Sequence, residues 1–246
     1  MASVMWIRAD WPAPAGITGG TTCRAGGVSR NSYASLNLAA HVGDDDRLVR
    51  VNRQRLVTAC GLPDEPVWLA QVHGTTVVRA EDSREVAGAD AVIARSANRV
   101  CAILTADCLP VLFVSDDGRE VAAAHAGWRG LCEGVLEATV AAFEPLPSRL
   151  MAWFGPAISQ RAFEVGEEVR DRFTGQDPAA AACFDENPRG RWQADLYGLA
   201  ALRLRKVGLT RIYGGGRCTF AEGDAFFSHR RDGQCGRMAT FVFRAG

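Results

Sequence analysis

The stretch VCAILTADCLPVLFVS, residues 100–115, decides the fold of this chain. It holds an apolar strand-like run from Val100 to Leu104, a polar step at Asp107-Cys108, and a second apolar run from Val111 to Ser115. A third run, VAAA, follows after a short polar gap and ends at His125. Strands that follow one another without an intervening helix favour a mixed α/β or α+β sheet over strict βαβ alternation.

Further elements can be predicted on both sides of this stretch. Strand-like runs are expected at residues 67–72, 75–79, 91–94, 150–154, 211–213 and 238–243. Helical patterns are expected at residues 44–60, 131–143, 163–173 and 195–207. The early segment 16–40 is rich in Gly, Ser, Thr and Asn, and is expected to form loops with short extended pieces. The sequence thus predicts an α/β (mixed α+β) fold, a single domain over residues 1–246 with central mixed β-sheets flanked by helices.

The composition argues against several classes of protein. Lys plus Arg and Asp plus Glu each number 28, so the zero net charge gives no general case for a nucleic acid or an anionic membrane as partner. No apolar run approaches the roughly 20 residues that span a bilayer, and no signal peptide is recognisable. Eight scattered cysteines without a CxxC pair are expected to be reduced, buried thiols. The sequence predicts a cytoplasmic protein.

Three residues that can bind a metal ion lie at the ends of strand-like runs. His73 closes the run VWLAQV, Cys108 follows the run that starts at Val100, and His125 closes the run VAAA. Each is followed closely by Gly or Pro. Thiolate and imidazole are usual ligands of zinc, and three protein ligands leave a fourth position for water or substrate. We therefore predict a catalytic zinc site made of His73, Cys108 and His125, able to activate a water or polarise a substrate oxygen.

Two other interpretations use the same residues. For any one of the three, a structural role as a core histidine or a buried thiol is the more common outcome, but the three together at strand ends favour a functional site. The second interpretation is a metal-free enzyme. In it Cys108 is a nucleophile, His73 or His125 is its base, and Asp107 or another carboxylate orients that base. Asp107 is thus a further candidate catalytic residue.

Four polar residues are predicted to contact a substrate. Asn37 stands among apolar residues in SLNL, and Gln71 lies two residues before His73, so it should face the same side of that strand. Arg129 lies at a glycine-flanked helix entrance, where it could bind an anion. Arg230 lies in FFSHRRD, which could hold a planar or phosphorylated ligand, with a solvated or salt-bridged turn as the alternative.

Several segments resemble a known protein family. They are SLNL with HVGD, WLAQVHG, TADCLP, HAGWRG, GPAI, FEVG, and FFS with RRD, and they follow one another over nearly the whole chain. Together they resemble the family known as polyphenol oxidase or laccase-domain proteins, as purine nucleoside phosphorylases and, in bacteria, as a peptidoglycan editing factor. One position departs from the pattern, because His229 stands where the family more often has an aromatic residue.

The resemblance implies a fold, a site and an activity. It implies a single α/β domain in which His73, Cys108 and His125 bind zinc. It also implies phosphorolysis of adenosine, inosine and S-methyl-5'-thioadenosine, with phosphate as the second substrate, and deamination of adenosine. Asp107 is then a candidate proton shuttle, although its place beside Cys108 on a strand could turn it to the other face. Arg129 could help to hold the phosphate.

The name laccase and two rival activities complete the set of hypotheses. A multicopper oxidase needs more histidines than the four in this chain, although copper could occupy the predicted zinc site and support weak phenol oxidation. A hydrolase or amidase that depends on Cys108 and edits peptidoglycan precursors is one rival, and it would survive chelators. A non-enzymatic binding protein is the other. The sequence leaves the oligomeric state open.

Overall fold

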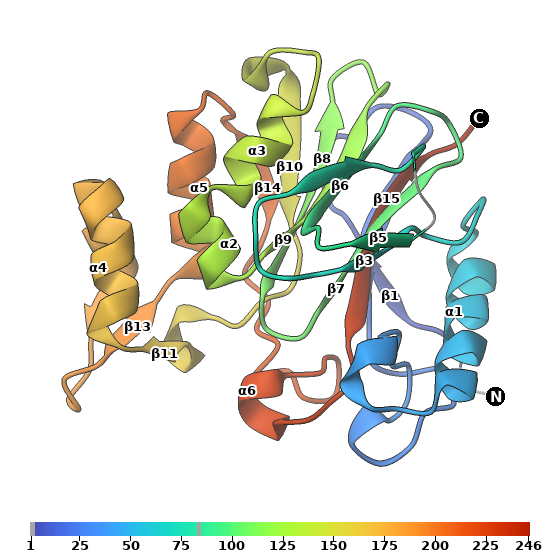
Figure 1. Ribbon diagram of the computed structural model, residues 1–246, viewed down its shortest axis with the longest axis horizontal. Helices are drawn as coiled ribbons and strands as arrows, with labels where there is room; N and C mark the ends of the chain where they lie inside the picture. Colours follow the sequence, from blue (N-terminus) through green and yellow to red (C-terminus); the bar gives the residue numbers. More distant parts are fainter. Residues whose placement is uncertain (1–2, 83–84) are drawn as a thin grey trace.

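Two β-sheets form the centre of the structure, a computed structural model that describes residues 3–82 and 85–246 (Figure 1). In the first sheet the strand order is β1-β2-β15-β7, and neighbouring strands are antiparallel. Its strands are β1 (Trp6–Arg8), β2 (Ile17–Thr22), β15 (Met238–Arg244) and β7 (Val100–Thr105). The first and last strands of the chain therefore lie in the same sheet.

The second sheet is mixed, with the strand order β14-β10-β8-β9-β6-β4. The pairs β14–β10 and β4–β6 are parallel, and the others are antiparallel. Its strands are β14 (Arg211–Gly214), β10 (Leu150–Phe154), β8 (Leu109–Ser115), β9 (Val121–Ala126), β6 (Ala91–Ala94) and β4 (Val77–Arg79). Smaller sheets are formed by β3 (Trp68–Ala70) with β5 (Glu85–Ala87), and by β11 (Glu164–Val165), β13 (Trp192–Ala194) and β12 (Phe184–Glu186).

The two central sheets pack face to face because their strands are apolar on both sides. Successive side chains of a strand point to opposite faces. In β8, Leu109, Val111 and Phe113 pack toward the helices, whereas Leu112 and Val114 pack toward the first sheet. Both faces of the second sheet are therefore buried, which explains why its strands read as continuous apolar runs.

Helices cover the outer faces of this sandwich (Figure 1). The second sheet is covered by α2 (Trp128–Glu133), α3 (Val135–Ala141) and α5 (Leu196–Lys206), and the first by α1 (Asp46–Cys60). The remaining α-helices of the described residues are α4 (Glu167–Gln176) and the single turn α6 (His229–Asp232). Short 3-10 helices are η1 (Asn31–Tyr33), η2 (Ala40–Val42), η3 (Pro147–Arg149), η4 (Gln160–Ala162) and η5 (Pro178–Cys183).

Helix α1 shows how local signals fix the ends of an element. The Asp45 carboxylate accepts a hydrogen bond from the Arg47 backbone N–H at 2.8 Å, as expected of an N-cap. Gly61 ends the helix in the left-handed conformation, with φ of 61°. Between these ends, Leu56 and Cys60 pack on the first sheet. The helix expected at residues 44–60 is thus present and begins two residues later.

Two expected helices differ from the structure. The pattern at residues 131–143 forms part of two helices, because Gly134 adopts a φ of 102° and separates α2 from α3. The pattern at residues 163–173 becomes helical only at Glu167, because the residues before it form β11, which pairs with β13.

The early segment contains more regular structure than expected. Strand β2 lies inside it and pairs with β1 on one side and β15 on the other. Its Gly20 leaves room for a neighbouring ring, because a Cβ there would lie 2.8 Å from Cε3 of Trp6. Glycine weakens the strand signal, so the composition indicated only loops with short extended pieces where a central strand of six residues lies.

The expected fold class, a mixed α/β domain with central sheets flanked by helices, is confirmed. All eight cysteines are free thiols. Among residues 3–82 and 85–246, no helix has both the length and the apolar character that a membrane crossing requires.

Candidate metal centre

The polar residues Asp107 and Cys108 form a corner at which the chain passes from the first sheet to the second. Strand β7 ends at Thr105 in the first sheet, and β8 begins at Leu109 in the second. Asp107 turns this corner with φ of 92°, in a region that residues with a Cβ rarely adopt. Cys108 follows it and stays partly exposed. The corner therefore presents a thiol at the edge of the sandwich.

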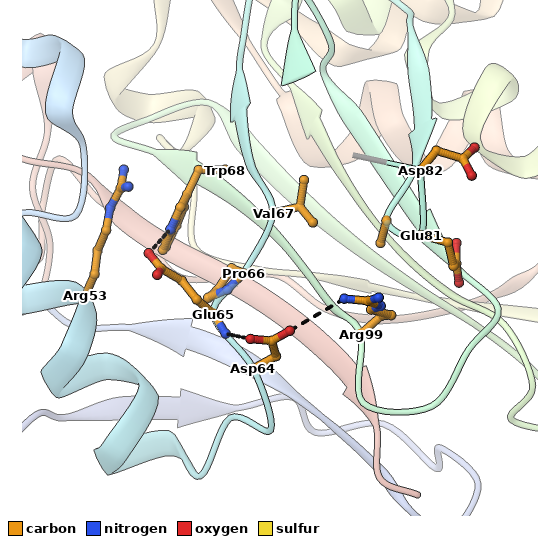
Figure 2. Close-up of a pocket in the computed structure, with 10 residues that line it drawn as sticks. Arg53, Asp64, Glu65, Pro66, Val67, Trp68, Glu81, Asp82 and Arg99 are labelled. Carbon is orange, nitrogen blue, oxygen red and sulfur yellow. Dashed lines mark hydrogen bonds and ion pairs between the residues drawn. The ribbon is translucent and has the colours of Figure 1, made fainter. Parts of the chain in front are cut away.

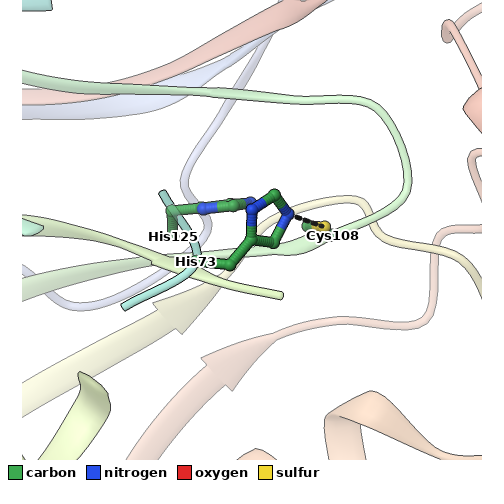
Figure 3. A group of neighbouring side chains, drawn as sticks. All are labelled: His73, Cys108 and His125. Atoms are coloured by element: carbon green, nitrogen blue, oxygen red, sulfur yellow. Dashed lines mark hydrogen bonds between the residues drawn. The ribbon is translucent and has the colours of Figure 1, made fainter. Parts of the chain in front are cut away.

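His73 and His125 lie beside this thiol (Figure 3). His125 lies near the end of β9 and is only 3% exposed, whereas His73 follows β3 in a loop and is exposed. Nε2 of His73 is 4.0 Å from Sγ of Cys108, and the two imidazole rings meet edge-on with centroids 4.8 Å apart. One ligand atom from each residue lies within 4.8 Å of the others. The structure thus brings together the three residues that the sequence grouped.

Asp90, directly before β6, holds both histidines. Its side chain is fully buried, and Oδ1 accepts hydrogen bonds from Nδ1 of His125 at 2.8 Å and from the His73 backbone N–H at 2.9 Å. Oδ2 accepts from the backbone N–H groups of Gly74 at 2.7 Å and Val72 at 3.1 Å. One carboxylate therefore sets the orientation of the His125 ring and the path of the loop that carries His73.

The electrostatics of the centre favour a thiolate. Burial alone would raise the pKa of Cys108, but the charge of His125 and the hydrogen bonds of both histidines outweigh it and lower that pKa below its ordinary value. Burial would lower the pKa of His125, but the Cys108 thiolate and the Asp90 carboxylate raise it. For Asp90, hydrogen bonds from His125 and the backbone outweigh burial and hold the pKa down. The thiolate is the form that binds a metal.

The donor set fits a resident metal ion. Because Nδ1 of His125 is bonded to Asp90, its Nε2 is the nitrogen left to bind a ligand. A carboxylate on the far nitrogen is the usual support of a metal-binding histidine. Cys108 adds a thiolate and His73 a second imidazole, a set that suits zinc and also copper. The geometry supports a metal site without choosing the ion.

Two glycines of the HAGWRG segment permit this close packing. A Cβ on Gly127 would lie 2.8 Å from Cδ2 of His73 and 3.0 Å from Sγ of Cys108. A Cβ on Gly130 would lie 2.8 Å from the carbonyl oxygen of Gly74. Both glycines are needed because α2 and the loop of His73 approach too closely for a larger residue.

We expect Gly127→Ala to weaken zinc binding by about 10- to 100-fold, the range found when the support of metal ligands is disturbed. The added methyl group must displace either His73 or Cys108. Competition titration with a chromogenic zinc chelator measures the affinity. Gly175→Ala is the matched control, because a Cβ there meets no atom within 4 Å and the residue lies in α4. Equal zinc affinity of the two variants would contradict the prediction.

Asp107 and Arg230 lie close together at the corner. Oδ1 of Asp107 accepts a hydrogen bond from the Thr219 hydroxyl at 2.6 Å, and Oδ2 accepts from the Arg230 backbone N–H at 2.7 Å. Nη1 of Arg230 donates to the Glu164 carbonyl at 2.9 Å, and its guanidinium lies 5.4 Å from the centroid of the Phe163 ring. Asp107 thus joins the corner to α6, and its catalytic role stays a prediction.

The structure contradicts the predicted substrate contact of Asn37 and shows what the Gln71 amide binds. Asn37 is fully buried, and its amide bonds Asp44, the backbone of Ala39 and the Arg237 N–H, so no polar atom is left for a ligand. The Gln71 amide exchanges two hydrogen bonds of 2.8 Å with the backbone of Leu104, as a strand neighbour would. It ties the loop of His73 to the end of β7. Asn37 therefore offers no amide group to a substrate, whereas a contact between Gln71 and a substrate stays a prediction.

Arg129 is exposed on the first turn of α2, and its guanidinium stacks 4.7 Å from the centroid of the Trp128 ring. Its contact with an anion stays a prediction.

A small cavity of about 140 Å³ opens beside the centre. Its apolar wall consists of Ala106, Trp128, Ile158, Phe163 and Leu196. Its polar wall consists of Asp107, Cys108, His229 and Arg230. Cys108 therefore belongs both to the metal centre and to a mainly apolar cavity, an arrangement typical of a binding site for a small organic molecule.

A larger cavity of about 640 Å³ lies elsewhere, with none of the three metal-binding candidates on its wall (Figure 2). Its charges are mostly satisfied within the protein. Arg99 lies 3.5 Å from Asp64, the Trp68 indole N–H donates to Glu65 at 3.0 Å, and Arg53 stacks on the Trp68 ring. Volume alone therefore does not identify the functional site.

Asp90 and the apolar wall of the small cavity could not be picked out from the sequence. Asp90 carried a weak signal, since an acid stands between Ala89 and the apolar strand β6. Phe163 and Ile158 lie in the segments FEVG and GPAI, but nothing in the sequence indicated that they line a cavity, because apolar residues in loops usually belong to the core.

Comparison with known proteins places the chain in a family. The model of the family described as multi-copper polyphenol oxidoreductase laccase matches residues 18–245. A protein named purine nucleoside phosphorylase YfiH from Escherichia coli (strain K12) is 51% identical over 238 residues, which cover 96% of this chain and 98% of that protein. A purine nucleoside phosphorylase from Haemophilus influenzae is 48% identical over 239 residues, which cover 96% and 98%.

Solved structures share the whole architecture. A Neisseria meningitidis protein of the DUF152 family superposes with a TM-score of 0.94 at 49% identity, covering 98% of this chain and 99% of that one. YlmD from Geobacillus stearothermophilus gives a TM-score of 0.92 at 33% identity, covering 98% and 96%. The family resemblance inferred from the motifs is thus confirmed, and the chain belongs to the family described as multi-copper polyphenol oxidoreductase laccase.

Proposed function

We propose that this protein is a zinc-dependent purine nucleoside phosphorylase that acts on adenosine, inosine and S-methyl-5'-thioadenosine, and that it also deaminates adenosine. Relatives at about half identity carry the name purine nucleoside phosphorylase. The observation that carries the proposal is that Cys108 belongs both to the His73–Cys108–His125 group and to the wall of the apolar cavity. A purine held in that cavity would lie next to the metal centre.

The residues around the cavity suit the parts of a nucleoside. Trp128 and Phe163 bring aromatic rings to the cavity wall beside a planar base, and Ile158 and Leu196 add apolar surface to it. Arg129 and Arg230 supply positive charge for a phosphate. A bound zinc ion would supply a Lewis acid for the attacking group, or an activated water for deamination. Phosphorolysis passes through a cation-like sugar, so it needs the attacking anion to be placed and the leaving base to be stabilised.

A second function has a specific observation in its favour. Cys108, His125 and Asp90 form a row in which the carboxylate orients the imidazole beside a low-pKa thiol. This is the arrangement of a cysteine hydrolase. The alternative is therefore a metal-independent amidase acting on peptidoglycan precursors. Weak phenol oxidation by a copper-loaded centre is a third activity that the same donor set would permit.

Chromatography of the reaction products tests the proposal. The zinc-loaded protein is incubated with each nucleoside and phosphate, then again after a chelator has removed the metal and after zinc or copper has been added back. We expect free base and sugar 1-phosphate, with inosine as a further product from adenosine, only in the metal-loaded samples. A folded, zinc-loaded protein without products would overturn the proposal. Activity that survives the chelator, together with cleavage of muropeptide amides, would establish the amidase.

We also propose the partners and the cellular location of the enzyme. Small molecules, a purine nucleoside and phosphate, are its proposed partners, with neither nucleic acid nor membrane. A cytoplasmic location is proposed because eight free thiols suit a reducing compartment.

A further inference from the structure

The departing purine needs a proton, and the cavity beside Cys108 contains few groups that can give one. Its polar wall consists of Asp107, Cys108, His229 and Arg230. Breaking the bond between C1′ of the sugar and N9 of the base leaves an anionic purine unless a proton reaches the ring. The group that supplies this proton must therefore border the space that the base occupies.

Three of the four polar residues are unsuited to this task. Both oxygens of Asp107 already accept hydrogen bonds, from the Thr219 hydroxyl at 2.6 Å and from the Arg230 backbone at 2.7 Å. Cys108 has a lowered pKa and is the thiolate of the metal centre. A guanidinium such as that of Arg230 does not release its proton in a protein. Among the described residues of this wall, His229 remains as a side chain whose ring nitrogens can both carry a proton.

The position of His229 also fixes which of its ring nitrogens can donate a proton to the base. Its Nδ1 lies 2.7 Å from the carbonyl oxygen of Gly233, the residue directly after α6. A carbonyl oxygen only accepts hydrogen bonds, so Nδ1 carries a proton and donates it there. Nε2 is then the nitrogen left to face a bound base. The side chain is exposed at the cavity, so this nitrogen can be reprotonated from solvent after each turnover.

We propose that His229 is the catalytic acid of purine phosphorolysis in this protein, and that it delivers the proton on Nε2 to N7 of the leaving base. A phosphate oxygen forms the new bond to C1′, and the C1′–N9 bond breaks with its electron pair passing to the purine. The purine takes the proton at N7 and leaves as a neutral base. The sugar phosphate releases its own proton to solvent, and His229 regains one from solvent. The inference rests on the proposed function.

A substrate that needs no proton isolates this step. In 7-methylinosine the base already carries a methyl group and a positive charge, so it leaves as a neutral molecule without an acid. Phosphate-dependent cleavage of inosine and of 7-methylinosine is measured for the zinc-loaded wild type, His229→Phe and His229→Gln. We expect both variants to lose about 10²- to 10⁴-fold in kcat on inosine, the usual contribution of a general acid. On 7-methylinosine they should stay within about threefold of the wild type.

The other outcomes separate the inference from the function on which it rests. Full activity of both variants on inosine, or equal losses on the two nucleosides, would show that His229 is not the acid, while the proposed function would stand. A wild-type protein that cleaves neither nucleoside would overturn the proposed function and this role with it. Melting temperature and zinc content of each variant show whether an equal loss is due to damage of the fold. Because His229 is exposed, we expect both values to match the wild type.

Discussion

Replacing Cys108 with alanine should reduce phosphorolysis of inosine by more than the roughly 100-fold that follows from disturbing the support of a metal ligand. The substitution removes the thiolate of the centre and leaves the two histidines to hold the metal. It also changes the wall of the cavity in which the base would lie. Because Cys108 is partly exposed at a corner between strands, the loss of its sulfur should leave the melting temperature within a few degrees of the wild-type value.

Cys218→Ala is the matched control for this experiment. Cys218 is also partly exposed, and burial would raise the pKa of its thiol, but hydrogen bonds from Ser159 and from the backbone of Ala221 hold it below the ordinary value. It is thus a second low-pKa thiol, yet it lines neither the metal centre nor the small cavity. Initial rates and zinc content are measured for both variants. A Cys108→Ala protein as active as the control would show that the metal centre takes no part in the reaction.

The grouping of His73, Cys108 and His125 could be predicted because each stands at the end of an apolar run. A strand fixes where its last residue lies, and Gly or Pro after it marks the turn. The sequence did not show that β7 and β8 belong to different sheets. That assignment depends on which face of each strand meets which layer, and runs that are apolar on both faces carry no such information.

The substrate contacts were harder to predict than the metal centre. A polar side chain among apolar residues indicates only that a partner exists. For Asn37 the partners are the backbone of the protein and the Asp44 carboxylate, and for Gln71 the partner is the backbone of Leu104. The sequence contains no mark that separates such residues from ligand contacts, because backbone and substrate offer the same hydrogen-bonding groups.

Asp90 could not be predicted as part of the site for a related reason. Its four donors come from a loop of residues 72–74 and from His125, and only the tertiary structure brings them to one carboxylate. Local sequence shows an acid before a strand, which is common at exposed positions. Complete burial of that acid, with every hydrogen bond of its side chain made to His125 or to the loop that carries His73, is what separates it from a surface residue.

Asp90→Asn should therefore impair both the metal centre and the fold. An asparagine has one acceptor oxygen where the aspartate has two, so its NH₂ group must face N–H donors, either those of Gly74 and Val72 or those of His73 and His125. We expect zinc affinity to fall by about 10- to 100-fold. The free energy of unfolding should fall by about 3–5 kcal/mol, the cost of breaking a buried charged pair. Zinc titration and urea denaturation of the metal-free protein measure the two effects separately.

Glu120→Gln distinguishes support of the centre from general stability. Glu120 is also a buried carboxylate, paired with Arg95, but it precedes β9 at the end opposite His125. Its loss should also lower the free energy of unfolding, because a buried carboxylate then loses its charge opposite the partly exposed Arg95, and should leave zinc affinity unchanged. If both variants lost zinc in proportion to their stability, Asp90 would be a structural residue only. A loss of zinc affinity confined to Asp90→Asn would show that this carboxylate positions the ligands, because the two variants differ in what the carboxylate holds and not in how deeply it is buried.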